Sequence, residues 1–311
     1  MSNLVNPTVA AQKDELAARF HPRDPFRHIV IDNFFTSDYC AQLLAQFPPF
    51  EQGNARNEAG EVGNKATIEK IRGLGPAFSA LDDLVRSREF LDLVGHITGS
   101  DDLLYDPWYF GGGTHENRQG QDLDAHVDFN RHPVERWHRR LNLIVYLNHQ
   151  WDASWGGALQ LHSDPRAADD RVITIAPLFN RAVIFETTEC SWHGFPRIDL
   201  PLAEQALTRK SVALYFYTKE RPVDELANTH STIYVDRTLP ERFAPGRTLD
   251  AADVEELRAL LARRDQHNQR LYRNLTSMTA KFEHAQAALY GGRLGRLHHV
   301  ARSILQYLRK H

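Results

Sequence analysis

The sequence predicts a mainly β domain with flanking helices, in which two sheets form a double-stranded β-helix of the jelly-roll or cupin-like kind, followed by a helical extension. Between positions 126 and 217, short runs rich in β-branched and aromatic residues alternate with turn residues. Candidate metal ligands stand at the ends of these runs. Beyond about Asp250 the strand-like runs cease and helical spacing takes over, which predicts the extension.

The strands follow from alternation along individual runs. In LNLIVYLN, Leu141, Leu143 and Val145 alternate with Asn142 and Ile144, which predicts one apolar face and one more polar face directed at a site. The runs ALQLH, RVITIAP, RAVIFET and RKSVALYFYT predict further strands, and FRHIVIDNFF predicts one upstream. YCAQLLAQF and FSALDDLVRSREFLDLVGHITG carry helical spacing, so we expect helices that buttress the sheets.

The composition indicates which classes of protein the chain can belong to. The 311 residues are 42% hydrophobic and 25% charged, which is ordinary globular usage, and the net charge of −3 argues against a nucleic-acid binder. Only Cys40 and Cys190 occur, which suits a reducing compartment. The first twenty residues have no apolar core of a signal peptide, so cytoplasmic residence is expected. We divide the chain into a lead-in (1–23), a main domain (24–245) and a helical extension (246–311).

The pair of His126 and Asp128, with His193 following 67 positions later (193 minus 126), is a candidate metal site. Residues two apart on a strand point the same way, so His126 and Asp128 can hold one ion. Two imidazoles and one carboxylate form the facial triad of non-haem Fe(II) oxygenases. A second H-x-D pair, His162 to Asp164, lies only 31 positions before His193 (193 minus 162), which leaves too little chain for the strands that should separate the ligands.

The middle third of the chain resembles the Fe(II)- and 2-oxoglutarate-dependent dioxygenases, in the prolyl-hydroxylase-like branch. The resemblance rests on HVD, YLN followed by W and GG, P-x-x-N-R-x-x-x-F, SWHG and RKS, in this order. It implies that His126, Asp128 and His193 bind Fe(II). It also implies 2-oxoglutarate and O2 as cosubstrates, and it allows ascorbate as a further cofactor.

The same resemblance assigns Arg209 to the distal carboxylate of 2-oxoglutarate, with the hydroxyls of Ser211 and Tyr146 beside it. Arg suits a buried carboxylate because its planar fork stays charged. Arg209 shares its strand face with Ser211, whereas Lys210 lies on the other face, so Arg209 is preferred.

Other polar positions near these motifs have two interpretations each. His132 either makes structural hydrogen bonds or touches substrate, and Arg181 either forms a salt bridge or binds an acidic substrate. The polar segment 55–70, ARNEAGEVGNKATIEK, is interpreted as a solvated loop, with a lid over the site as the alternative.

The implied function is hydroxylation of an unactivated C–H bond. The first candidate substrate is a prolyl residue in a protein or peptide, and the alternative is a sugar, lipid-linked glycan or small metabolite. Halogenation is disfavoured because the carboxylate of Asp128 occupies the position that a halide would need. A different class, a degenerate oxygenase fold serving as a coiled-coil scaffold, is disfavoured because all six site residues are present.

The extension contains two patterns. From about 250 to 290, apolar residues keep a three-four spacing interrupted by Arg264 and Asn268, which predicts a heptad helix that pairs two subunits or packs on its own domain. Residues 291–311 carry five basic and no acidic side chains around an apolar helical face. This tail predicts peripheral contact with an anionic membrane, with a solvated face or a dimer contact as alternatives.

Overall fold

The computed structural model describes residues 4–21, 24–56, 62–240 and 242–290. By its contacts the chain divides into two compact units, Met1–Asp236 and Arg237–His311. The first unit holds both sheets, and the second holds one long helix, α6. The boundary of 245 and 246 expected from the sequence stays a prediction.

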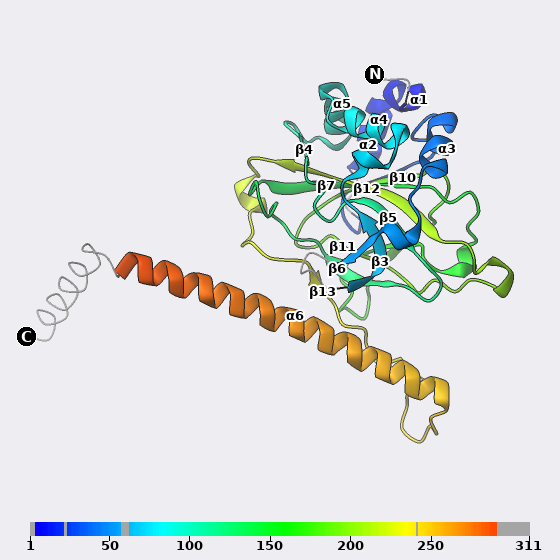
Figure 1. The fold of residues 1–311 in the computed structure, drawn as a ribbon, viewed down its shortest axis with the longest axis vertical. Helices are drawn as coiled ribbons and strands as arrows, with labels where there is room; N and C mark the ends of the chain where they lie inside the picture. The colour runs from blue at the N-terminus through cyan, green and yellow to red at the C-terminus, as the bar shows by residue number, and fades with distance from the viewer. Residues whose placement is uncertain (1–3, 22–23, 57–61, 241, 291–311) are drawn as a thin grey trace, which may run out of the picture. The chain divides into compact units, whose positions relative to one another are not determined.

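The first unit contains two antiparallel sheets (Figure 1). The larger sheet has the order β1-β10-β7-β12-β5-β3-β2, with β4 added beside β12, and the smaller has the order β13-β6-β11-β8-β9. The strands of the larger sheet are β1 (His28–Ile31), β2 (Asn54–Arg56), β3 (Val62–Ile68), β4 (Leu104–Tyr105), β5 (Gly113–Asn117), β7 (His138–Tyr146), β10 (Ala182–Glu186) and β12 (Arg209–Thr218). Those of the smaller sheet are β6 (Leu123–Val127), β8 (Leu159–His162), β9 (Val172–Ile175), β11 (Trp192–Phe195) and β13 (Ile233–Tyr234). The predicted fold class is confirmed.

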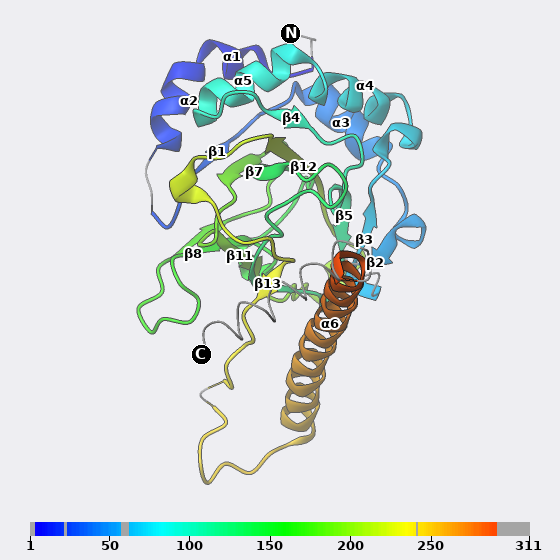
Figure 2. The same cartoon turned by 90° about the vertical axis from the view of Figure 1, so that its left-hand side faces the viewer.

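Five helices cover the outer face of the larger sheet (Figure 2). They are α1 (Pro7–Ala11), α2 (Lys13–Phe20), α3 (Ser37–Ala45), α4 (Pro76–Val85) and α5 (Arg88–Thr98). The main core lies between them and the sheet, where Leu141, Leu143 and Leu214 pack with Phe78 and Phe90. The apolar half of the alternation in β7 therefore faces the helices, and its polar half faces the smaller sheet.

A smaller apolar cluster closes the space between the two sheets at one end. It joins Val183 and Phe185 of the larger sheet to Leu159, Leu161 and Ile175 of the smaller one. Because this end is filled with aliphatic and aromatic side chains, the polar residues of the inner faces gather at the other end. The site lies there.

The second unit contains α6, which runs from Ala251 to Tyr290 over 40 residues. Several large apolar side chains of the predicted heptad seam are exposed, including Leu271, Leu275, Met278 and Phe282. Within the described residues, no helix is both long enough and apolar enough to cross a membrane. The basic segment 291–311, to which we assigned membrane contact, lies outside the described residues, as do the side chains of 288–290.

Candidate active site

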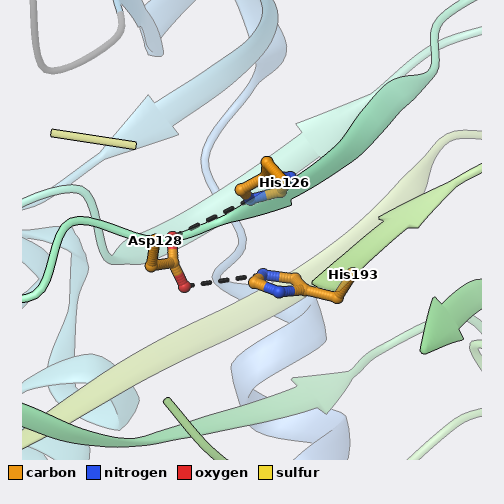
Figure 3. Close-up of side chains that lie close together, drawn as sticks. All are labelled: His126, Asp128 and His193. Carbon is orange, nitrogen blue, oxygen red and sulfur yellow. Dashed lines mark ion pairs between the residues drawn. The ribbon is translucent and has the colours of Figure 1, made fainter. Parts of the chain in front are cut away.

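Strand pairing brings the three predicted metal ligands together. His126 of β6 lies directly opposite His193 of β11 in an antiparallel pair. Asp128 immediately follows the last residue of β6, and Figure 3 shows its carboxylate directed toward both imidazoles. Its Oδ1 lies 3.8 Å from Nε2 of His126, and its Oδ2 lies 3.5 Å from Nε2 of His193. One candidate ligand atom from each residue falls within a single cluster no wider than 4.8 Å.

Both imidazoles are held in the orientation that a metal needs. Nδ1 of His126 contacts the carbonyl of Asp124 at 2.9 Å, and Nδ1 of His193 contacts the carbonyl of Ser191 at 2.9 Å. A carbonyl only accepts, so each Nδ1 donates and each Nε2 keeps its lone pair toward the cluster. Burial lowers the pKa of His126 to about 3 and also lowers the pKa of His193. Both rings are therefore neutral near pH 7, as metal ligands must be.

Asp128 is kept ionised by residues of β7. Burial by itself raises the pKa of Asp128, but the charge of Arg139 and the hydrogen bond from Asn142 hold it well below its usual range. Nη2 of Arg139 lies 3.1 Å from Oδ2 of Asp128, and Nδ2 of Asn142 donates to the same oxygen at 2.8 Å. Two neutral imidazoles and one fixed carboxylate are a donor set that fits Fe(II).

Arg139 is a site residue that the sequence reasoning missed. Strict alternation along β7 would place Arg139 on the face of Leu141, toward the helices. Against β12, however, Phe216 pairs with Leu141 and Tyr217 pairs with Arg139, so the register shifts by one residue at Arg140. This β-bulge turns Arg139 inward. The guanidinium lies 3.6 Å from the ring centroid of Tyr215. A bulge of this kind leaves no mark in the hydrophobic pattern.

At the other end of the cavity, Arg209 forms a fixed cation. Its Nε donates to the carbonyl of Gly157 at 2.6 Å, and its Nη2 donates to the hydroxyl of Tyr146 at 3.1 Å. Among the residues that the structure describes, Arg209 forms no ion pair, and burial lowers its pKa. A buried cation without a counter-ion in its own chain is costly. The cavity is thus suited to a carboxylate ligand, which fits the distal end of 2-oxoglutarate.

Of the other two residues predicted to contact the cosubstrate, Ser211 lines the cavity and Tyr146 does not. Ser211 is buried on β12 two residues after Arg209, and its side chain lines the same cavity. Tyr146 is fully buried and reaches the site through its hydrogen bond to Arg209, without lining the cavity itself. Lys210 faces the opposite side of β12, where Nζ pairs with Glu116 at 2.9 Å. The preference for Arg209 over Lys210 agrees with this geometry.

One open cavity of about 980 Å³, counting the space at its mouth, contains the triad, Arg139, Arg209 and Ser211. Its wall also includes residues that the sequence analysis did not assign, namely Lys65, Thr67, Glu69, Gly111, His115, Asn117, Phe129, Tyr215, Thr232 and Tyr234. Three of these belong to the segment 55–70. The interpretation of that whole segment as a solvated loop is wrong, because β3 spans 62–68 and pairs with β5 in the larger sheet.

Several polar residues near the motifs lie elsewhere. Nδ1 of His162 contacts Asp170 at 2.7 Å, so His162 is absent from the metal cluster. His132 is fully buried with Nε2 at 3.2 Å from Asp106, and this structural hydrogen bond replaces the suggested contact with substrate. Arg181 pairs with Asp32 through both Nε, at 2.6 Å, and Nη2, at 3.0 Å, which supports the salt-bridge interpretation.

Comparison with known proteins agrees with this site. Residues 112–217 match the model of the 2OG-Fe(II) oxygenase superfamily, and this range contains the triad and Arg209. The matched region therefore forms a domain similar to that superfamily, as its motifs predicted. The enzyme class, a 2-oxoglutarate-dependent non-haem iron dioxygenase, and the cofactors Fe(II) and 2-oxoglutarate are confirmed at the level of this domain.

The similar proteins include a curated relative and several solved structures. The mouse (Mus musculus) prolyl 3-hydroxylase OGFOD1 is 26% identical over 210 residues, which is 62% of this chain and 33% of that protein. The chain thus corresponds to about a third of the length of this relative. A Trichoplax adhaerens prolyl hydroxylase, in complex with a peptide fragment of the hypoxia inducible factor oxygen degradation domain, is 16% identical with a TM-score of 0.46, covering 68% of this chain and 90% of that one. A Pseudomonas putida prolyl-4-hydroxylase is 17% identical with a TM-score of 0.41, covering 70% and 98%.

Proposed function

We propose that the chain is a hydroxylase that uses Fe(II), 2-oxoglutarate and O2 to oxidise a prolyl residue of a peptide or protein. In the balanced reaction, 2-oxoglutarate, O2 and the substrate C–H group give succinate, CO2 and the C–OH product. The observation that carries the proposal is the presence, in one cavity, of a neutral-imidazole and carboxylate triad and an uncompensated buried arginine. The prolyl substrate is supported by the activity named for the mouse relative.

Each residue of the site has a separate task. His126, Asp128 and His193 would hold the metal through Nε2, carboxylate and Nε2 atoms, and Arg139 with Asn142 fixes the carboxylate. Arg209 would bind the distal carboxylate of 2-oxoglutarate in a bidentate manner and so orient the molecule toward the triad. Fe(II) with 2-oxoglutarate and O2, when bound, supplies the oxidising power. The protein holds these groups in a largely buried space that limits access of water.

The test is anaerobic binding followed by product analysis. Calorimetry should detect 2-oxoglutarate binding only when Mn(II), as a redox-stable substitute for Fe(II), is present. Aerobic incubation with Fe(II), 2-oxoglutarate, ascorbate and proline-containing peptides should yield succinate together with peptides that have gained one oxygen atom. Absence of binding would favour the scaffold alternative. Binding with oxidation of a sugar or small metabolite, and of no peptide, would favour the other hydroxylase.

The assignments to partners and location belong to the same proposal. Two subunits would pair through 250–290, since α6 exposes apolar side chains at heptad spacing. The basic segment 291–311 would meet an anionic membrane surface from the cytoplasm. Ascorbate would serve as an accessory reductant. No nucleic acid is proposed as a partner, in keeping with the net charge of −3.

A further inference from the structure

A segment beyond the family-matched region forms part of the cavity wall. This segment, residues 227–236, is called the strap here, and it follows the matched range of 112–217. It ends in β13, which pairs antiparallel with β6, the strand that carries His126. The backbone N–H of Val235 donates to the carbonyl of Ala125 at 2.8 Å and extends this pairing. β13 thus covers the outer edge of the smaller sheet beside the metal strand.

The pairing places Tyr234 in line with two metal ligands. Tyr234 lies opposite His126 on β6, and His126 lies opposite His193 on β11. Residues directly opposite in antiparallel strands point to the same face of the sheet. The ring of Tyr234 stacks on that of His126, with centroids 5.1 Å apart and planes at 29°. Tyr234 therefore faces the cavity, whereas its neighbour Ile233 points to the other face and is 39% exposed.

Strand direction defines which end of the cavity belongs to 2-oxoglutarate. Phe195 lies two residues beyond His193 along β11 and pairs with Leu123, the first residue of β6. The guanidinium of Arg209 lies 4.2 Å from the ring centroid of Phe195. The end of the cavity that would hold 2-oxoglutarate therefore lies on the Phe195 and Leu123 side of the triad.

Read backwards from Tyr234 to Thr232, the strap runs away from this end of the cavity. Tyr234 pairs with His126 and Ile233 pairs with Val127, so the next residue back along the strap, Thr232, comes level with Asp128. Thr232 shares the cavity face with Tyr234 because the two are two positions apart on an extended segment. Its side chain is buried and lines the cavity. Thr232 therefore lies on the side of the triad away from Arg209, and Tyr234 lies level with His126 and stacks on its ring.

The strap is held in place by contacts within the chain. Nδ2 of Asn130 donates to the carbonyl of Asn228 at 2.8 Å, and Oδ1 of Asn130 accepts from the backbone N–H of His230 at 3.1 Å. Nε2 of His230 lies 3.0 Å from Glu189. Because Asn130 comes two residues after Asp128, these contacts fix the strap to the segment that carries a metal ligand. A wall fixed in this way is pre-organised for binding.

We propose that Thr232 and Tyr234 contact the primary substrate and determine which residues are accepted around the oxidised position. The inference rests on the proposed function. The half of the cavity beyond the triad is where a substrate C–H group must lie, since Arg209 reserves the other half for 2-oxoglutarate. The aromatic rings of Tyr234 and Phe129 suit the apolar ring of a prolyl residue. The strap, which lies outside the family-matched residues 112–217, would thus determine selectivity among substrates.

The experiment compares the full chain with Tyr234→Ala, Tyr234→Phe and the matched control Ile233→Ala, which alters the same strand on its opposite face. Calorimetry gives the affinities for Mn(II) and for 2-oxoglutarate without oxygen. A peptide library with a central proline and varied flanking residues, read by mass spectrometry, gives relative kcat/KM for each sequence. We expect Tyr234→Ala to change the kcat/KM ratios among peptides by about tenfold. The affinities of Tyr234→Ala for Mn(II) and for 2-oxoglutarate should stay within about threefold of the wild type. Ile233→Ala should match the wild type in both affinities and in its peptide preferences.

Three outcomes would decide against the proposal. An unchanged order of peptide preference in Tyr234→Ala would overturn it directly. Loss of Mn(II) affinity in both Tyr234 variants, with no change of preference, would make Tyr234 a support for His126 instead. A wild-type protein that binds Mn(II) and 2-oxoglutarate but oxidises none of the peptides would refute the prolyl hydroxylase function itself, and the inference with it. Retention of wild-type preferences by Tyr234→Phe would show that the ring, and not the hydroxyl, makes the contact.

Discussion

Nη2 of Arg139 lies 3.1 Å from Oδ2 of Asp128, and both side chains are largely buried. This ion pair places a positive charge beside the carboxylate that we assign to the metal. Since Asn142 donates to the same oxygen at 2.8 Å, the carboxylate has little freedom to rotate. The carboxylate is therefore fixed by side chains of the same chain, and the bulge in β7 is the feature of the backbone that brings Arg139 to it.

The first prediction is that Arg139→Ala destabilises the metal-free protein. Removing one partner of a buried ion pair leaves the other charge uncompensated, and this typically costs about 3–5 kcal/mol. Urea unfolding of the wild type and the variant would measure the loss. Arg88→Ala is the control, because Arg88 is exposed and pairs with Asp92 on the same helix. It should change stability by less than about 0.5 kcal/mol. Equal stability of Arg139→Ala and Arg88→Ala would contradict the role given to Arg139.

The second prediction separates the two H-x-D pairs. Asp128→Ala should abolish conversion of 2-oxoglutarate to succinate, since two imidazoles alone lose the facial geometry and most of the metal affinity. His162→Ala should retain nearly full turnover, because His162 contacts Asp170 and takes no part in the metal cluster. Succinate assays with circular dichroism as a check on folding would measure both. Wild-type turnover by Asp128→Ala would remove the basis for the assigned triad.

The third prediction concerns the cosubstrate. Arg209→Lys should weaken 2-oxoglutarate binding by about one to two decades, because loss of one charge-assisted hydrogen bond costs roughly 1.5–3 kcal/mol. Mn(II) affinity should be unchanged. Lys210→Ala is the neighbouring control, since Lys210 pairs with Glu116 on the other face of β12. If Lys210→Ala impaired binding and Arg209→Lys did not, the role would pass to Lys210.

The sequence was sufficient for the fold and for much of the site because those features depend on local patterns. Alternation in β7 and β12 identifies the face that carries Arg209 and Ser211, and short motifs identify the triad. Arg139 was missed because a one-residue register shift reverses its direction. Tyr234 was missed because a two-residue strand is too short to show alternation. Both positions depend on pairing between distant segments, which no local pattern encodes.

The fourth prediction concerns pH. Burial, and after it the charge of Lys65, hold the pKa of His115 well below its ordinary value of 6.5. The unfolded chain therefore takes up a proton near pH 6.5 that the folded protein does not. Burial of neutral His115 is therefore compatible with full stability above about pH 6.5. As the pH falls below that value, the free energy of unfolding decreases by at most roughly 1.4 kcal/mol per pH unit.

The variant His115→Gln isolates this contribution. Gln retains a donor for the carbonyl of Gly111, which Nε2 of His115 contacts at 3.0 Å. Urea unfolding at pH 7.5, 6.5 and 5.5 should show a smaller loss of stability on acidification in the variant than in the wild type. Parallel curves for the two proteins would mean that His115 titrates alike in the folded and unfolded states.

The last prediction concerns α6. In the heptad assignment, Leu275 lies on the seam between Leu271 and Met278, and all three side chains are more than half exposed. A charge placed in such a seam would be buried on pairing, so Leu275→Glu should convert a dimer into a monomer. Ala280→Glu adds the same charge on the opposite side of the helix and should leave the dimer intact. Sedimentation velocity of the full-length chains would measure both.

The same variants test the membrane contact assigned to 291–311. A single basic amphipathic segment binds anionic lipid only marginally, whereas two segments presented by a dimer act together. Flotation with anionic vesicles at low salt should therefore recover the wild type and Ala280→Glu, but little of Leu275→Glu. Salt should weaken the binding, because the attraction is screened within a Debye length of about 8 Å at physiological ionic strength. If the wild type is monomeric and remains with the unbound protein at low salt, neither the dimer nor the membrane assignment holds.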